Sequence, residues 1–155
     1  MMHHSNILAI FLGSLMFFHL SYAQDYCYGN KSIAGYCTPL TYTDTTSKFT
    51  SPPTTGNCQD ACRGVITDAG DWSVDFATAG SGIHGMLLYP CGFGVTRGKD
   101  TPANANFLMA NQDIIDLYDE SINRFGGKHG GKISAEGTMN CSNYLVNWYI
   151  QDLNA

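Results

Sequence analysis

Two stretches of the chain carry hydrophobic residues at the spacing of a helix. In the first, residues 57–69, apolar side chains recur at positions i, i+4, i+7 and i+8, which indicates one buried face. Asn57 is the expected N-cap, since its side-chain oxygen can accept a backbone N–H of the first turn, and Gly70 is expected to end the helix. The expected buried face consists of Cys58, Cys62, Val65 and Ile66.

The second stretch predicts a longer helix over residues 112–125, between a cap at Asn111 and a terminating Gly126. Asp113 lies in its first turn, where a negative charge suits the positive end of the helix dipole. We expect the polar residues opposite the apolar face to be in water. The expected buried face consists of Ile114, Ile115, Tyr118, Ile122 and Phe125, and the expected solvent face of Asp116, Asp119, Glu120 and Asn123.

Alternating or short apolar runs predict strands in much of the remaining chain. Trp72, Val74 and Phe76 alternate with polar residues and are expected to point inward. Pro90 is expected to break or bend the run that contains it, because proline cannot donate to a strand ladder. The predicted strands cover residues 72–76, 86–89, 91–95, 132–141 and 144–153, and in the last of them Tyr144, Val146, Trp148 and Ile150 share one face.

Residues 38–56 follow neither pattern. They contain eight Thr, two Ser and three Pro, which predicts an exposed loop held at its ends by Cys37 and Cys58. The predicted fold is therefore α+β, with two helices packed on one antiparallel sheet and disulfides stapling the whole. In this organisation an N-terminal arm and loop, residues 24–56, precede a domain of residues 57–155.

The first 23 residues have the composition of a secretory signal peptide. They contain no Lys, Arg, Asp or Glu, and their apolar run, residues 7–20, is shorter than the about 20 residues that span a bilayer. Ser21-Tyr22-Ala23 places small residues at the two positions that signal peptidase recognises. We expect cleavage before Gln24 and a secreted, extracellular mature chain without a later membrane-spanning segment.

All six cysteines lie in the expected mature chain. An even number of cysteines behind a signal peptide predicts three disulfides, but leaves their pairing open. Cys58 and Cys62 would lie about 5–6 Å apart at Cβ on one helical face, whereas a disulfide needs about 3.8 Å. We therefore expect these two cysteines to bond to different partners. The full set is Cys27, Cys37, Cys58, Cys62, Cys91 and Cys141.

The charge of the chain excludes two classes of partner. The net charge is −5, and no cluster of Lys or Arg is present. Nucleic-acid binding and adsorption to anionic lipid both draw on a concentrated positive surface. We therefore expect neither a nucleic-acid partner nor stable membrane insertion.

Motifs for metal or phosphate binding are incomplete. Cys58 and Cys62 have the spacing of zinc ligands, but no second close pair of Cys or His accompanies them. The glycine-rich segment 126–132 has the glycine and lysine spacing of a phosphate loop. It follows a helix instead of preceding one, however, and Ile133 occupies the position of the metal-binding Ser or Thr. We expect no metal and no cofactor.

Candidate catalytic groups are few. The acidic residues of the second helix allow the hypothesis of a glycosidase carboxylate pair, but such a pair must flank a cleft, and a solvated helix face is the simpler explanation. His84 and His129 lie in glycine-rich turns without an adjacent nucleophile motif. We expect no catalytic residues and no enzymatic activity.

Three surface features could contact a partner or carry a modification. Asn30 opens the sequence Asn-Lys-Ser, a candidate site of N-linked glycosylation. Cations at the tip of a mobile glycine turn could meet an anionic target. Tyrosines near the N-terminus either form a surface for carbohydrate or protein, or cover a sheet edge, which is the simpler interpretation. The cations are Lys128, His129 and Lys132, and the tyrosines are Tyr26, Tyr28, Tyr36 and Tyr42.

Short sequence blocks over residues 37–150 resemble those of a known family, the fungal Ecp-type secreted effectors, which carry the Hce domain of necrosis-inducing factors. The densest region of similarity is residues 111–148. The blocks include Trp72-Ser73-Val74, Cys91-Gly92-Phe93-Gly94-Val95, Asn111-Gln112-Asp113-Ile114-Ile115-Asp116, Ala135-Glu136-Gly137-Thr138-Met139-Asn140-Cys141 and Val146-Asn147-Trp148.

The resemblance implies a small secreted fungal protein, in a family of which some members provoke necrosis in plants. It also implies a fold similar to the viral killer toxins of smut fungi, which impair ion channels in competing fungi. Cys27 and Cys62 would be an added pair, and no catalytic residue is carried over. The family's usual cysteines would correspond to Cys37, Cys58, Cys91 and Cys141.

We therefore expect a non-enzymatic effector or toxin-like protein that acts at the surface of a host plant or competitor cell, with necrosis as one outcome. The target would be a surface protein, a channel or a wall glycan. Two alternatives are a small secreted hydrolase acting on cell-wall polymer and a structural wall-associated protein.

Overall fold

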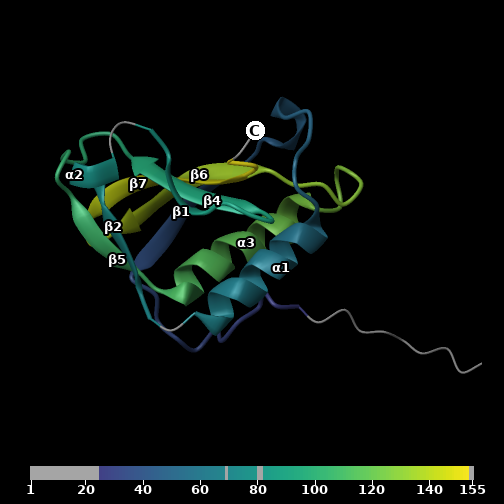
Figure 1. Cartoon of the computed structure of the whole chain (residues 1–155), viewed down its shortest axis with the longest axis horizontal. Helices are drawn as coiled ribbons and strands as arrows, with labels where there is room; N and C mark the ends of the chain where they lie inside the picture. Colours follow the sequence, from purple (N-terminus) through teal and green to yellow (C-terminus); the bar gives the residue numbers. More distant parts are fainter. Residues whose placement is uncertain (1–24, 69, 80–81, 154–155) are drawn as a thin grey trace, which may run out of the picture.

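The computed structural model describes residues 25–68, 70–79 and 82–153. The expected signal segment lies outside these residues. Figure 1 shows a twisted sheet with two long helices side by side beneath it. The chain is thus α+β, as the sequence predicts, with helices and antiparallel strands stapled by disulfides.

Five antiparallel strands form the main sheet in the order β1-β6-β7-β4-β3. The two longest central partners, β6 and β7, are joined by a tight turn in which Ser142 and Asn143 both have positive φ. The predicted strands 86–89, 91–95, 132–141 and 144–153 correspond to four of these strands, with shifted ends. The bounds are β1 Cys37–Asp44, β3 His84–Leu87, β4 Gly92–Arg97, β6 Ala135–Cys141 and β7 Tyr144–Gln151.

The prediction of a loop over residues 38–56 is wrong at its start, because β1 occupies residues 37–44 and pairs with β6 along its length. Threonine is β-branched and suits a half-buried pleated surface, so a Thr-rich segment forms a strand once a partner strand is present. Tyr42 supplies the inward contact, with its ring 5.0 Å from that of Trp148. The rest of the segment holds a short turn of 3-10 helix, Thr46–Lys48.

A second, two-stranded sheet pairs β2 (Trp72–Asp75) with β5 (Asn106–Met109). The predicted strand 72–76 therefore ends one residue early, and Phe76 begins the single turn α2 (Phe76–Ala79). Strand β5 was not expected, since four residues between polar turns carry too little alternation to stand out.

The two long helices are α1 (Thr55–Thr67) and α3 (Asn111–Phe125). Both expected N-caps are wrong, Asn57 by three residues and Asn111 by one. Thr54 is the N-cap of α1, and it forms a capping box in which its hydroxyl accepts the Asn57 N–H at 3.1 Å. Ala110 precedes α3, and its N–H donates to Asp113 Oδ2 at 2.8 Å. Gly126 follows the last turn of α3, as predicted.

The expected solvent face of α3 is only partly correct. Asp119 is buried and accepts a hydrogen bond from Lys31 of the N-terminal segment at 2.7 Å. Asp116 accepts a second bond from the same ammonium at 2.7 Å. The carboxylates of this face thus dock another part of the chain, which helical periodicity alone does not reveal.

Three disulfides use all six cysteines. The prediction that Cys58 and Cys62 bond to different partners is confirmed, since Cys58 bonds to Cys91 and Cys62 to Cys27. The third bridge, Cys37–Cys141, joins residues that lie directly opposite each other in the β1–β6 ladder.

The core lies between the main sheet and the two helices. Alternate residues of β7 point into it, as predicted, and Trp148 is fully buried at its centre. The Tyr118 hydroxyl, also buried, donates to the Cys91 carbonyl oxygen at 2.7 Å. The largest fully buried side chains are Trp148, Tyr118, Phe93, Met109, Ile114, Ile115, Leu117, Ile133, Met139 and Ile150.

Candidate functional site

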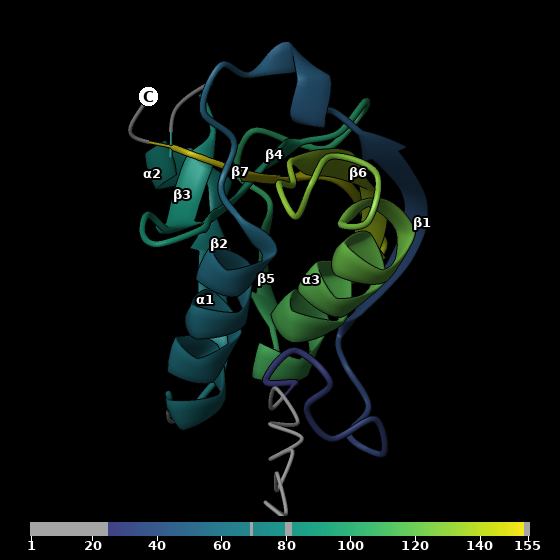
Figure 2. The same ribbon diagram turned by 90° about the vertical axis from the view of Figure 1, so that its right-hand side faces the viewer.

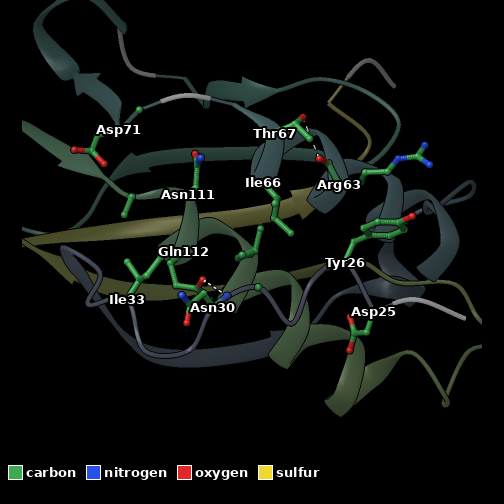
Figure 3. Close-up of a pocket in the computed structure, with 14 residues that line it drawn as sticks. Asp25, Tyr26, Asn30, Ile33, Arg63, Ile66, Thr67, Asp71, Asn111 and Gln112 are labelled. Atoms are coloured by element: carbon green, nitrogen blue, oxygen red, sulfur yellow. Dashed lines mark hydrogen bonds between the residues drawn. The ribbon is translucent and has the colours of Figure 1, made fainter. Parts of the chain in front are cut away.

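A cavity of about 630 Å³ opens where the N-terminal segment, residues 25–36, crosses the end of α1 and the start of α3. Figure 2 shows this segment passing below the first turn of α3. The close-up in Figure 3 shows side chains from all three elements around the space. The lining consists of Asp25, Tyr26, Gly29, Asn30, Ile33, Arg63, Ile66, Thr67, Gly70, Asp71, Ala110, Asn111, Gln112 and Ile115.

The N-terminal wall of the cavity is held to α1 at its first residues. Cys27 is bonded to Cys62, and the N–H groups of Tyr26 and Cys27 both donate to the side-chain oxygen of Gln59, at 2.7 and 3.2 Å. Gln59 in turn donates its amide to Asp25 at 2.9 Å. This half of the wall is therefore fixed by one covalent bond and a closed set of hydrogen bonds.

The same segment is tied to α3 further along. The Asn30 N–H donates to the side-chain oxygen of Gln112 at 2.9 Å, and Lys31 binds both Asp116 and Asp119. Partial burial acts to lower the pKa of Lys31, but its hydrogen bonds to the two carboxylates outweigh that effect and raise the pKa. The lysine therefore stays charged while it closes this side of the wall.

Gly29 allows the segment to pass close to α3. Its φ of +56° lies in the left-handed region, which favours glycine. A Cβ atom at this position would also meet the ends of the Ile115 and Gln112 side chains, which would have to shift.

Apolar side chains form the floor of the cavity. Ile115 of α3 is buried, whereas Ile33 and Ile66 are 54% and 44% exposed. The prediction that Ile66 belongs to the buried stripe of the first helix is therefore wrong. The buried face of α1 ends at Val65, and the side chain of Ile66 lines the cavity. Exposed large aliphatic residues gathered in a hollow mark an interaction site more often than scattered ones do.

The rim carries more negative than positive charge. The lining holds two carboxylates, Asp25 and Asp71, and one guanidinium, that of Arg63. That guanidinium is paired with Asp60 at 3.0 Å and lies over the Tyr26 ring at 5.4 Å. Asp71 accepts the Tyr36 hydroxyl at 3.0 Å, and this hydrogen bond raises the pKa of Tyr36.

The amide side chains of the lining already bond to the protein itself. Asn111 accepts the Trp72 indole N–H at 2.6 Å and donates to the Asp68 carbonyl at 2.9 Å. Gln112 donates to Asp116 at 2.7 Å while it accepts from Asn30. These groups therefore position the three walls.

Asp113 lies just behind this site. Its two oxygens accept the N–H groups of Ala110, Tyr36 and Cys37, at 2.8, 3.0 and 3.1 Å. Burial raises the pKa of Asp113 above its usual value, although the three donors act in the opposite direction. The carboxylate thus joins the start of α3 to the start of β1, which the expectation of a solvated acidic face did not foresee.

The structure does not bring the predicted target-facing cations to this cavity. Lys128 and Lys132 are exposed on the glycine-rich turn that follows α3, and His129 of the same turn contacts Asp44 at 2.8 Å. The cavity lies at the other end of α3, whose 15 residues extend about 22 Å at 1.5 Å per residue.

The four N-terminal tyrosines do not form one surface. Tyr26 lines the cavity, Tyr28 is exposed beneath Lys31, and Tyr36 bonds to Asp71. Tyr42 is partly buried and packs against the core, where burial raises its pKa to about 12. Of the four, only Tyr42 lies in a strand of the main sheet, the edge strand β1.

Within residues 25–68, 70–79 and 82–153, no three His, Cys, Asp or Glu side chains gather closely enough to hold a metal ion. Among the same residues, no helix combines the length and the apolar composition required to cross a bilayer.

The fold and the cavity define a small disulfide-stapled α+β domain with an apolar recess. Residues 36–141, more than half of the chain, match the family Hce2, described as "pathogen effector; putative necrosis-inducing factor". The chain belongs to this family. Curated protein sequences gave no significant match. The implied likeness to killer toxins stays a prediction.

The family match begins at residue 36, after the N-terminal wall of the cavity. The recess is thus built jointly, from helix ends inside the matched region and from a segment that precedes it.

Proposed function

We propose that this protein is secreted and acts outside the producing cell, as an effector that binds a protein at the surface of a host plant or competitor cell. Membership of the pathogen effector family and three disulfides support an extracellular site of action. The observation that carries the proposal of binding is the cavity between the N-terminal segment, α1 and α3. Necrosis of the target tissue is the expected consequence.

The lining of the cavity suits recognition better than catalysis. Its amides are engaged in bonds that hold the walls, and its floor offers exposed Ile33 and Ile66. A nucleophile beside a general base, the arrangement that covalent catalysis requires, does not occur among the lining residues. The exposed Ile33 and Ile66 can bury an apolar side chain of a partner, and the carboxylates of Asp25 and Asp71 can attract a positive charge.

The shape and charge of the recess indicate what kind of partner it takes. An aliphatic or aromatic side chain of the partner would cover the two isoleucines, because burial of apolar surface supplies most of the free energy of such contacts. The two rim carboxylates, Asp25 and Asp71, favour a Lys or Arg next to that anchor. The proposed partner is therefore a protein surface with an apolar anchor beside a basic residue.

The test uses two pairs of exposed aliphatic residues. The double variant I33S/I66S removes the floor of the cavity, whereas the control L40S/L108S changes residues outside it that are equally exposed, at 54% and 44% in both pairs. Each protein, secreted and disulfide-bonded, is infiltrated into leaf tissue and added to cultures of competing fungi. Fluorescently labelled samples report retention on the cell surface.

We expect the wild type and the control to be retained and to damage the target cells, and the cavity variant to lose both properties. Equal loss in the two double variants, or full activity of the cavity variant, would contradict a role of the recess. An inactive wild type in both settings would contradict the proposed function itself.

A further inference from the structure

We propose a second binding site, for a neutral polysaccharide, on the face of the main sheet that points away from α1 and α3. This inference does not depend on the cavity. Both long helices lie on one side of the sheet in Figure 1. We call the surface on the opposite side the outer sheet face; it consists of Thr41, Thr43, Thr96, Glu136, Thr138, Asn147 and Tyr149. Thr41 and Thr43 are exposed, and its other side chains are half-buried.

The strand register arranges these residues in two rows across four strands. Tyr42 and Trp148 contact each other on the helix side, so their sequence neighbours point outward. One row therefore runs Thr41–Thr138–Asn147–Thr96 and the other Thr43–Glu136–Tyr149–Gly94, from β1 to β4 in both cases. With strands about 4.8 Å apart, three spacings make a platform about 14 Å wide, enough for a short oligosaccharide.

Two hollows meet at Tyr149. One, of about 310 Å³, lies towards β1 between Thr43 and Asn147, and the other, of about 540 Å³, lies towards Arg97 and Asp100. The Tyr149 hydroxyl is held by Thr96 Oγ1 at 3.3 Å. Its neighbour in the row is Gly94, and Ile83 and Leu153 fill the space outside that glycine. The half-buried Tyr149 ring thus borders both recesses.

The chemistry of the outer sheet face matches hydroxylated, uncharged ligands. Threonine hydroxyls and amides can donate and accept, as sugar hydroxyls do. Thr41 and Thr138 already bond to each other at 2.8 Å, and the Asn147 amide donates to Thr96 Oγ1 and the Arg97 carbonyl oxygen. A sugar would therefore use the exposed Thr43 hydroxyl and the remaining oxygen lone pairs of the face. The face of an aromatic ring is electron-rich and attracts the polarised C–H groups on one side of a pyranose.

The outer sheet face has little net charge to attract an ionic ligand. Glu136 is paired with Lys48 at 3.0 Å, and the larger hollow contains one positive residue, Arg97, and one negative residue, Asp100.

Binding is measured by calorimetry on the folded, disulfide-bonded protein. The neutral probes are hexasaccharides of β-1,4-linked glucose, β-1,3-linked glucose and β-1,4-linked N-acetylglucosamine, and an oligogalacturonate of equal length is the anionic comparison. We expect at least one neutral probe to bind more tightly than the anionic one. The variant Y149A should weaken that binding about tenfold or more, the loss of roughly one good aromatic contact.

A second variant guards against a folding defect in Y149A. Thr43 is exposed on the edge strand β1, so T43R fills the smaller hollow without disturbing the core. T38R is its control, because Thr38 is exposed on the same strand outside both hollows. T43R should weaken binding like Y149A, T38R should not, and the cavity variant I33S/I66S should bind sugar as the wild type does.

The inference is overturned if the wild type binds no neutral hexasaccharide, if the oligogalacturonate binds most tightly, or if Y149A and T43R bind as well as the wild type. Y149A and T43R should lose sugar binding but still damage target cells, whereas I33S/I66S should still bind sugar but cause no damage. These two results would distinguish the sugar site from the proposed function of the cavity.

Discussion

Cys27 is bonded to Cys62, so the N-terminal wall of the cavity is covalently attached to the helix that forms its opposite side. The bridge closes 35 positions of sequence, and the segment that it anchors precedes the region of family similarity. The recess therefore depends on a contact that the matched region alone does not contain.

Removal of this bridge tests its energetic role. C27S/C62S should lower the free energy of unfolding by about 2–4 kcal/mol, measured by denaturant titration. In the chain-entropy model, C37S/C141S should lower it by about 1 kcal/mol more, because that bridge closes 104 positions instead of 35. If C37S/C141S instead lowered the free energy of unfolding less than C27S/C62S, the Cys27–Cys62 bridge would stabilise the protein by more than loop closure. The excess would come from packing of the N-terminal wall.

Substitution of Asp113 tests the junction between α3 and β1. In the wild type, both carboxylate oxygens of Asp113 accept backbone N–H groups. D113N replaces one of these oxygens with an NH₂ group, which cannot accept, so at least one backbone N–H loses its partner. We expect a loss of about 1–3 kcal/mol in the free energy of unfolding, the penalty for an unsatisfied buried donor. The control E120Q removes only the exposed pair with Arg124, and should change stability by about 0.5 kcal/mol or less. Equal effects of both variants would argue against the junction.

The contact between Asp44 and His129 predicts a dependence of stability on pH. Partial burial acts to raise the pKa of Asp44, but hydrogen bonds from His129 and Thr46 outweigh it and hold the pKa below the usual 3.8. A lowered carboxyl pKa stabilises the fold above the unfolded value, and this stabilisation is lost as the pH falls through the folded value.

D44N should therefore be less stable than the wild type at neutral pH, with a difference that shrinks well below pH 3.8. Denaturant titrations across this range give the difference directly. The control D60N, at an exposed pair with Arg63, should show a small difference throughout. A constant difference for D44N would contradict the assignment.

The sequon at Asn30 predicts a glycan at the rim of the cavity. The Ser32 hydroxyl donates to the Asn30 side-chain oxygen at 2.6 Å, and both residues are exposed. Protein secreted from a eukaryotic host should carry N-linked sugar on the peptide that contains Asn30, detected by mass spectrometry before and after enzymatic deglycosylation. S32T should keep the modification and S32A should lose it. An unmodified peptide from the wild type would refute the prediction.

The sequence by itself determined the features that depend on neighbouring residues. Helical periodicity placed both long helices to within two residues, because an apolar stripe and its terminating residues are local signals. The spacing of Cys58 and Cys62 excluded a bond between them, since the geometry of one helical turn decides it.

Only the tertiary structure decided what depends on distant partners. The Thr-rich segment became β1 because β6, about a hundred positions later, offers it a ladder and a disulfide. Ile66 became a cavity residue because the N-terminal segment stops short of covering it, and Asp119 became buried because Lys31 reaches it. The rows of the outer sheet face arise in the same way, because they combine residues of four strands that lie side by side only in the folded sheet.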